Sequence, residues 1–184
     1  MRKLIAWNLM SLDGLFEGPE PWLLDFHAAI YGPELQQLSM EQLGEAGLLL
    51  FGRKTYEGMA DYWSKSTEPE AAGMNSLPKA VISNTLVHAD WSNTRLLQGD
   101  AAELVRGLKA EQGGPIYVFG SADLLTTLLA DGLVDEYRLA IAPVLLGRGT
   151  PLFKPTDVKT HLELKSARPI QNGGLLLFYD VKPA

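Results

Sequence analysis

Residues 47–63 of the chain read GLLLFGRKTYEGMADYW. The first six residues, 47–52, form an apolar run of strand length, and the eleven that follow, 53–63, have a composition that suits a helix. A buried strand that passes directly into a helix is the unit from which α/β proteins are built. This stretch therefore predicts an α/β fold, and the sequence on both sides of it repeats the same alternation.

The segments before residue 47 fit the first unit of such a fold. Residues 3–10 (KLIAWNLM) are apolar and of strand length, and residues 11–21 are rich in turn formers. Residues 22–46 suit a helix, with an interruption at Gly32-Pro33 where one helical piece ends and another begins. We therefore expect a strand, a loop and two helical pieces ahead of the strand at 47–52.

The segments after residue 63 continue the alternation. Residues 64–78 are expected to form a surface loop, and Asp100 is expected to cap the helix that follows it. Further strands are predicted at 79–84, 94–98, 115–120 and 135–144, and further helices at 100–112 and 121–132. A link rich in glycine and proline at 145–155 leads to two closing strands, near 159–168 and 174–182, joined by the turn residues QNGG at 171–174.

This order of elements predicts one α/β domain over residues 1–184. Short apolar strands that alternate with helices form a mostly parallel sheet with helices on both faces. The closing pair of strands is expected to add an antiparallel hairpin at one edge of that sheet. The chain has no internal repeat, low-complexity tract or interdomain linker.

Composition excludes several classes of function. The net charge is −6 and the 16 lysines and arginines are scattered, which argues against a nucleic-acid partner. The chain has no cysteine, so disulfides, thiolate metal sites and cysteine nucleophiles are excluded. Its three histidines, His27, His88 and His161, lie far apart in sequence, and we expect no metal site. No window approaches 18 apolar residues and the N-terminus does not resemble a signal peptide, so we expect no membrane partner and a cytoplasmic location.

The junction Phe51-Gly52-Arg53-Lys54-Thr55 is the first candidate binding site. The N-terminus of a helix offers unpaired backbone N–H groups and the positive end of the helix dipole, and it therefore binds phosphates. The same dipole disfavours Arg53 and Lys54 at this end unless an anion compensates them. The alternative is that both side chains extend into solvent.

The second candidate is the junction Val118-Phe119-Gly120-Ser121-Ala122-Asp123. Three small residues in succession after a strand let a diphosphate approach the backbone closely. The alternative is a tight turn in which Ser121 is the N-cap of the helix. Neither junction matches the G-x-G-x-x-G fingerprint or the P-loop pattern, so a standard Rossmann enzyme and a P-loop NTPase are both poor fits.

Taken in order, these segments resemble the dihydrofolate reductase superfamily. The resemblance rests on the first strand with its Ser-Leu-Asp-Gly loop and on the stretches 49–57, 79–84 and 116–121. The run LVDEYRLAIAPVLLGRG at 133–149 narrows it to the reductase domain of the bifunctional riboflavin-biosynthesis deaminase-reductase and its free-standing relatives. Each motif is weak alone, but the ordered set is fairly specific and covers nearly the whole chain.

The resemblance implies a three-layer dihydrofolate-reductase-like fold with NADPH across the strand ends. Arg53 and Thr55 would meet the 2′-phosphate and diphosphate side, and Ser83 and Asn84 would lie along the adenosine. The second junction would pass under the diphosphate and nicotinamide. The cofactor-binding residues implied in this way are Gly52, Arg53, Lys54, Thr55, Ser83, Asn84, Phe119, Gly120, Ser121 and Ala122.

The sequence departs from the family pattern at two places, the second junction and the segment expected to grip the substrate. Gly120-Ser121 stands where these reductases carry Gly-Gly, which puts a cis or strained geometry at that bond in doubt. Residues 36–43 (QQLSMEQL) hold no arginine, whereas riboflavin reductases place an Arg/His-rich helix there to grip the substrate phosphate. The resemblance therefore leaves the ribosylamino-pyrimidine phosphate as one possible substrate.

The catalytic candidates are two acids near the first strand. Asp13 matches an aspartate of the riboflavin-reductase pattern and could orient the substrate or supply a proton, or it could simply bond its own turn. Asp25 follows a Pro-Trp stretch similar to that of dihydrofolate reductases but lies two residues closer to the tryptophan. Trp7, Phe16 and Trp22 could wall a pocket for a planar substrate, although core packing is the more common use of such residues.

The resemblance implies an NADPH-dependent reductase of a C=O or C=N bond in a small heterocyclic metabolite. The activity that this prediction resembles is that of 5-amino-6-(5-phosphoribosylamino)uracil reductase of riboflavin biosynthesis. The alternatives are a true dihydrofolate reductase and a non-catalytic NADPH-binding protein. An apolar terminal hairpin needs its edge covered, and the resembling reductases commonly pair, so we also expect a homodimer.

Overall fold

The computed structural model describes residues 1–182. Its main strands are β1 (Leu4–Ser11), β3 (Leu48–Gly52), β4 (Lys79–Ile82), β5 (Thr94–Leu97), β6 (Ile116–Phe119), β7 (Glu136–Ala142), β9 (Leu162–Pro169) and β10 (Leu175–Val181). They form one sheet in the order β5-β4-β3-β6-β1-β7-β10-β9. All pairs from β5 to β7 are parallel, and β10 and β9 add the antiparallel pairs at one edge.

Helices cover both faces of this sheet and make it a three-layer α/β structure. The helices are α1 (Pro33–Glu45), α2 (Arg53–Trp63), α3 (Ala71–Ser76), α4 (Ala101–Ala110) and α5 (Ala122–Ala130), with a 3-10 turn η1 at Asp25–Ala29. Successive residues of β1 point to opposite faces, so Leu4 and Ala6 pack with α4 and α5. Ile5 and Trp7 pack with α1, α2 and α3 on the other face. The two apolar cores therefore lie on either side of an apolar first strand.

The expected architecture is confirmed, including the mostly parallel sheet and the antiparallel closing hairpin. Asp100 caps α4, because its Oδ1 accepts a 2.9 Å hydrogen bond from the backbone N–H of Glu103. The prediction of a plain loop at 64–78 was wrong for α3, which packs Met74 into the core. Two short strands, β2 (Leu15–Glu17) and β8 (Thr150–Pro151), also form inside segments that we expected to be irregular, because each is the other's partner.

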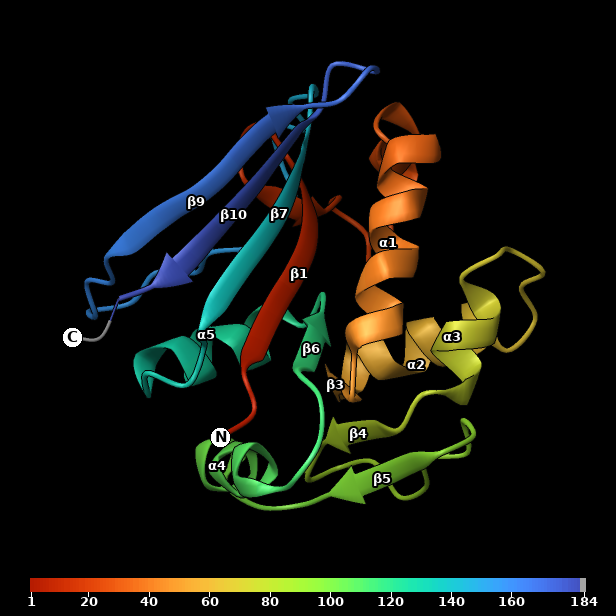
Figure 1. Ribbon diagram of the computed structural model, residues 1–184, viewed down its shortest axis with the longest axis vertical. Helices are drawn as coiled ribbons and strands as arrows, with labels where there is room; N and C mark the ends of the chain where they lie inside the picture. Colours follow the sequence, from red (N-terminus) through yellow and green to blue (C-terminus); the bar gives the residue numbers. More distant parts are fainter. Residues whose placement is uncertain (183–184) are drawn as a thin grey trace.

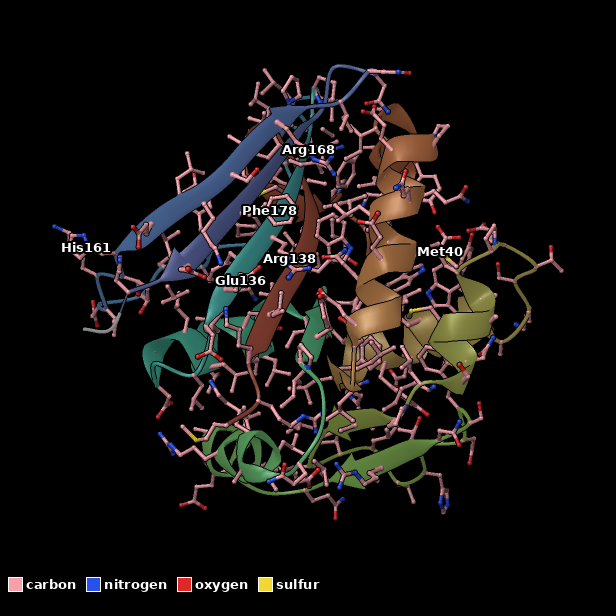
Figure 2. All side chains as sticks on the ribbon, in the orientation of Figure 1. Met40, Glu136, Arg138, His161, Arg168 and Phe178 are labelled. Carbon is pink, nitrogen blue, oxygen red and sulfur yellow. The ribbon has the colours of Figure 1, made fainter. Side chains whose placement is uncertain are left out.

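Beside α1, the 3-10 turn η1 packs against β7, and β10 and β9 continue the sheet beyond β7. Figure 1 shows α1 alongside β1, with β7, β10 and β9 on the other side of β1. Arg138, Phe178 and Arg168 come from these three strands in Figure 2, and the Arg138 guanidinium lies 5.7 Å from the centre of the Phe178 ring. Every residue of β9 is exposed. Among residues 1–182, no helix is long and apolar enough to cross a membrane.

Candidate functional site

A cleft of about 1220 Å³ opens at the carboxyl ends of β1, β3, β4 and β6. Open α/β sheets bind their ligands at this end, where the strand order reverses on either side of the first strand. All ten residues predicted to bind the cofactor line this one cleft, although they come from three separate segments of the chain. They are Gly52, Arg53, Lys54, Thr55, Ser83, Asn84, Phe119, Gly120, Ser121 and Ala122.

Two reciprocal hydrogen bonds join the two predicted junctions. The backbone N–H of Gly52 donates to Ser121 Oγ at 3.0 Å, and the backbone N–H of Ser121 donates to Thr55 Oγ1 at 3.1 Å. Each helix thus supplies a hydroxyl to the N-terminus of the other. The positive ends of α2 and α5 lie side by side as a result, and together they favour an anion in the cleft.

Ser121 does not cap its own helix, although it occupies the N-cap position of α5. Its Oγ accepts from Gly52 and donates to the carbonyl of Phe119 at 3.3 Å. No side chain of residues 1–182 caps the first turn of α5 or of α2. Ser121 thus holds the N-cap position that the alternative gave it, but its side chain does not cap α5, and backbone N–H groups in the first turns of both helices stay open to a ligand.

Gly120 and Ser121 both have left-handed backbone conformations, with φ of +61° and +59°. The Gly120–Ser121 peptide is trans. A Cβ at Gly120 would meet Thr55 Cγ2 at 3.0 Å, so a side chain here would push the two helix ends apart. Glycine therefore suits this position on two counts, its φ and the close approach of α2. Serine holds the second left-handed position because its hydroxyl bonds Gly52.

The first turn of α2 carries two cations and no acidic residue. The Arg53 guanidinium forms an ion pair with Glu57 one turn further along α2, with 3.0 Å between Nη1 and Oε2, and both side chains are exposed. An exposed pair of this kind contributes little stability and can exchange for another anion. Arg53 and Lys54 both line the cleft. The alternative, in which their side chains extend into solvent, stays open, because Lys54 is exposed and Arg53 is only half-buried.

A third helix N-terminus opens on the far end of the cleft. Gly99, Asp100 and Ala101, at the start of α4, line it together with Ser83 and Asn84. Asn84 Oδ1 accepts a 2.7 Å hydrogen bond from the Gly99 N–H, which ties the loop after β4 to the loop after β5. These two loops form the wall where the resemblance implies the adenosine.

The opposite end of the cleft is apolar and aromatic. Trp7, Phe16 and Trp22 all line it, so the use as a pocket wall holds for these residues even where they also pack in a core. Glu17 reaches the same space and accepts hydrogen bonds from the Trp22 N–H and the Thr150 hydroxyl. The sequence singled out neither Glu17 nor His27. The position of Glu17 depends on the β2–β8 pairing, which local patterns did not predict. His27 lies in η1, inside the first predicted helical piece, but nothing in that pattern marked it as a cleft residue.

His27 is held in its neutral form at this end. It lines the cleft and packs edge-on against Phe26, with ring centres 4.6 Å apart. Burial lowers the pKa of His27 to about 4, and the nearby charge of Asp25 offsets this only in part. A neutral imidazole beside the cleft can donate or accept a hydrogen bond without placing a charge next to the ligand.

Asp13 is not among the residues that line the cleft. Its Oδ1 accepts from the Ser11 hydroxyl at 2.6 Å, and its Oδ2 accepts from the Gly147 N–H at 2.8 Å. The Ser11 hydroxyl first, and then the Gly147 N–H, lower the pKa of the Asp13 carboxyl. Asp13 therefore anchors the segment around Gly147 to the loop after β1. Its catalytic role stays a prediction, and the lowered pKa favours orientation of that loop over proton donation.

Asp25 also lies outside the cleft wall, at the exposed start of η1. Leu24 and His27 on either side of it do line the cleft. Asp25 thus lies beside the aromatic end of the cleft, and its charge acts on His27. Its catalytic role likewise stays a prediction.

The comparison with protein families agrees with this geometry. The family model described as the RibD C-terminal domain matches residues 2–176, nearly the whole chain. The chain belongs to the RibD C-terminal domain family. A relative in Bacillus subtilis (strain 168), the uncharacterized protein YyaP, is 30% identical over 97% of this chain and 94% of its own length.

Solved structures with the same fold match nearly the whole chain. A putative riboflavin biosynthesis protein from Shewanella sp. PV-4 matches with a TM-score of 0.83 and 20% identity, covering 98% of this chain and 99% of the other. Dihydrofolate reductase from Enterococcus faecalis, solved with NADP(H) and RAB-propyl, matches with a TM-score of 0.67 and 14% identity, covering 98% and 97%. The dihydrofolate-reductase-like fold expected from the sequence is confirmed.

Proposed function

We propose that this protein is an NADPH-dependent reductase of a C=O or C=N bond in a small heterocyclic metabolite. The observation that carries the proposal is the pair of helix N-termini, α2 and α5, joined by the Gly52–Ser121 and Ser121–Thr55 hydrogen bonds. Membership of the RibD C-terminal family and the fold shared with a dihydrofolate reductase solved with NADP(H) support it.

The residues present fit a phosphorylated dinucleotide. Within residues 1–182, neither Gly52 nor Ser121 caps the first turn of its own helix with a side chain, and the first turn of α2 has two cations without an acid. Arg53 suits a phosphate with two charges better than a ribose hydroxyl, because its guanidinium can make two parallel hydrogen bonds. We therefore assign the 2′-phosphate to Arg53 and the diphosphate to the N–H groups of the α2 and α5 termini.

Bound NADPH supplies the hydride from its nicotinamide ring. The chain's own residues bind and orient the reacting groups. Trp7, Phe16 and Trp22 form an apolar wall for a planar substrate and keep water away from it. Asp13, through Gly147, holds the loop beside this wall. Neutral His27 offers a hydrogen bond to a heteroatom of the substrate.

The experiment that tests the proposal has two stages. Titration with NADPH is followed by tryptophan fluorescence, because two of the four tryptophans, Trp7 and Trp22, line the cleft. NADPH oxidation is then measured with ribosylamino-pyrimidines, pterins, dihydrofolate and small aldehydes. Saturable binding and turnover of a ribosylamino-pyrimidine is the expected result. Turnover of dihydrofolate alone would favour a dihydrofolate reductase, binding without any turnover would favour a non-catalytic protein, and the absence of binding would contradict the proposal.

We also propose that two copies of the chain pair as a homodimer. The edge strand β9 is exposed along its whole length, and Leu162 and Leu164 on it are 40% and 52% exposed. Exposed edges with apolar side chains are normally covered in native proteins. Light scattering at micromolar concentration should give twice the mass of the chain, and the mass of one chain would reject the proposal.

A further inference from the structure

A second pocket lies on the face of the sheet that α4 and α5 cover. Its volume is about 200 Å³, and α5, β7 and the connection between β8 and β9 line it. In Figure 1, α5 lies at the lower end of β7, where that strand begins. Among residues 1–182, Lys154 alone lines both this pocket and the cleft. The pocket is therefore distinct from the proposed cofactor site.

This pocket, called the α5 pocket below, has apolar and aromatic walls. Its lining includes Leu125 and Leu129 of α5, Tyr137 of β7, and Leu152, Phe153 and Val158 of the β8–β9 connection. The rings of Tyr137 and Phe153 meet edge to face, with their centres 5.5 Å apart. Phe153 and Val158 are exposed, although both are large and apolar. Exposed apolar side chains gathered around a hollow are typical of a ligand site.

Tyr137 brings a polar group into the α5 pocket. The residue is only 2% exposed, and its hydroxyl forms no hydrogen bond within residues 1–182. The unpaired polar atoms that are sealed from solvent in this part of the chain belong to Arg2, Asn8, Gln42, Glu70 and Thr94. The Tyr137 hydroxyl is not among them, so it keeps accessible surface. Because the residue is otherwise buried and lines the pocket, that surface opens into the pocket.

The Tyr137 hydroxyl is a donor without an acceptor. Burial raises the pKa of Tyr137, so the phenol keeps its proton. The hydroxyl of Thr126, which also lines the pocket, donates to the Ala122 carbonyl of its own helix at 2.8 Å. Buried tyrosine hydroxyls normally find such a partner, and phenylalanine would fill the same space without an unpaired donor. The fold thus supplies no use for this hydroxyl, whereas a ligand in the pocket would.

We propose that the α5 pocket binds a small, neutral, single-ring aromatic molecule that carries a carbonyl oxygen. An engineered apolar cavity of about 150 Å³ in another protein binds benzene, so about 200 Å³ admits one ring with a short substituent. The ring packs against Phe153 and the leucines, and the carbonyl accepts from the Tyr137 hydroxyl. The ligand is neutral because Lys154, the cation of the lining, is already paired with Asp123. This site is independent of the proposed cofactor and reaction.

The experiment uses two probes of nearly the same size. Acetophenone has one ring and a carbonyl, and isopropylbenzene has an apolar group in place of that carbonyl. Tyr137→Phe should bind acetophenone about fivefold more weakly than wild type, as for loss of one neutral hydrogen bond. Its affinity for isopropylbenzene should not change, and its Tm without ligand should be equal or higher. Titrations that follow the backbone amide NMR shifts of the protein without NADPH measure both affinities.

Two further variants serve as controls. Tyr56 is also a buried tyrosine, but it packs in the core on the opposite face of the sheet and lines neither the α5 pocket nor the cleft. Tyr56→Phe should leave both affinities unchanged. Leu129 is half-buried in the pocket wall, and Leu129→Trp should abolish the binding of both probes by filling the pocket. Thr126→Leu fills the same wall if Leu129→Trp does not fold.

The outcomes decide the proposal without reference to NADPH. Saturable acetophenone binding that is weakened in Tyr137→Phe and abolished in Leu129→Trp supports it. The absence of saturable binding, shifts confined to the cleft, or equal acetophenone affinities in wild type and Tyr137→Phe would overturn it. Acetophenone affinity that falls as the protein concentration rises would show that a second copy of the chain covers the pocket, and would overturn it as well. None of these results bears on NADPH binding, so the proposed function stands or falls separately.

Discussion

The two ends of the cleft are built in different ways. At the end where we propose the phosphates, called the phosphate end below, the cleft is lined by the starts of α2 and α5, whose first-turn backbone N–H groups are uncapped within residues 1–182 and which Thr55 and Ser121 hold together. At the aromatic end, the lining groups are side chains from β1, β2 and η1, among them Trp7, Phe16 and His27. Each half of the phosphate end is a local strand–helix junction, and two hydrogen bonds join the halves. The aromatic end is assembled entirely from segments that contact one another only in the fold. A change at one end should therefore leave the other end's function measurable.

The largest expected effect is at the phosphate end. Gly120→Val should abolish NADPH binding, because its Cβ would press on Thr55 at 3.0 Å and separate the two helix ends. Gly132→Val is the matched control: Gly132 has a similar φ of +65°, with no atom within 4 Å of the added Cβ. Both variants lose stability through the left-handed backbone, by about 1–2 kcal/mol. Titration should show NADPH affinity lost in the first and kept in the second; equal affinities would remove the junction from the site.

A second large effect is expected at the aromatic end. Asp13→Asn should lower turnover by about 10²-fold, because it weakens the hold on Gly147 and misplaces the adjoining loop. NADPH affinity should not change, since the phosphate end is untouched. Single-turnover hydride transfer and cofactor titration separate the two quantities. Unchanged turnover would exclude Asp13 from the reaction and leave Asp25 as the acid to test.

A smaller effect concerns the dependence of stability on pH. The pKa of His27 is about 4 in the folded protein, against 6.5 for an unburied histidine. Below pH 6.5 the unfolded chain therefore binds a proton that the folded protein does not. This difference should lower the free energy of unfolding by roughly 2–3 kcal/mol as the pH falls from 6.5 to 4. Denaturant titrations at several pH values measure this loss. In His27→Gln the loss of unfolding free energy between pH 6.5 and pH 4 should be smaller by roughly 2–3 kcal/mol, and an unchanged loss would contradict a neutral His27 in the folded protein.

The smallest effect is expected away from both ends. Lys79 is fully buried beneath α3, and its Nζ donates to the carbonyls of Met74, Asn75 and Leu77 at 2.8, 3.1 and 2.8 Å. Lys79→Met should cost roughly 1–3 kcal/mol of unfolding free energy, because buried carbonyls lose their donor. NADPH affinity should stay the same. A parallel loss of affinity would show that the sheet, and not the helix ends alone, sets the phosphate site.

The same contrast explains how far the sequence alone could lead. The junctions at Gly52–Thr55 and Gly120–Ala122 were predictable, because a strand, small residues and a helix start are contiguous in the chain. Their reciprocal hydrogen bonds were not, since they join residues 69 and 66 positions apart.

The central claim is that the α2 and α5 termini bind a dinucleotide and that Arg53 recognises its 2′-phosphate. The most direct test is the ratio of NADH to NADPH dissociation constants in the wild type and in Arg53→Ala, with Arg106→Ala as an exposed arginine that lines no part of the cleft. We predict that the wild type prefers NADPH by about 1.5–3 kcal/mol, the usual range for a hydrogen bond to a charged group. The ratio should fall close to one in Arg53→Ala and stay unchanged in Arg106→Ala. Equal affinities for NADH and NADPH in the wild type, or equal losses for both in Arg53→Ala, would contradict the account.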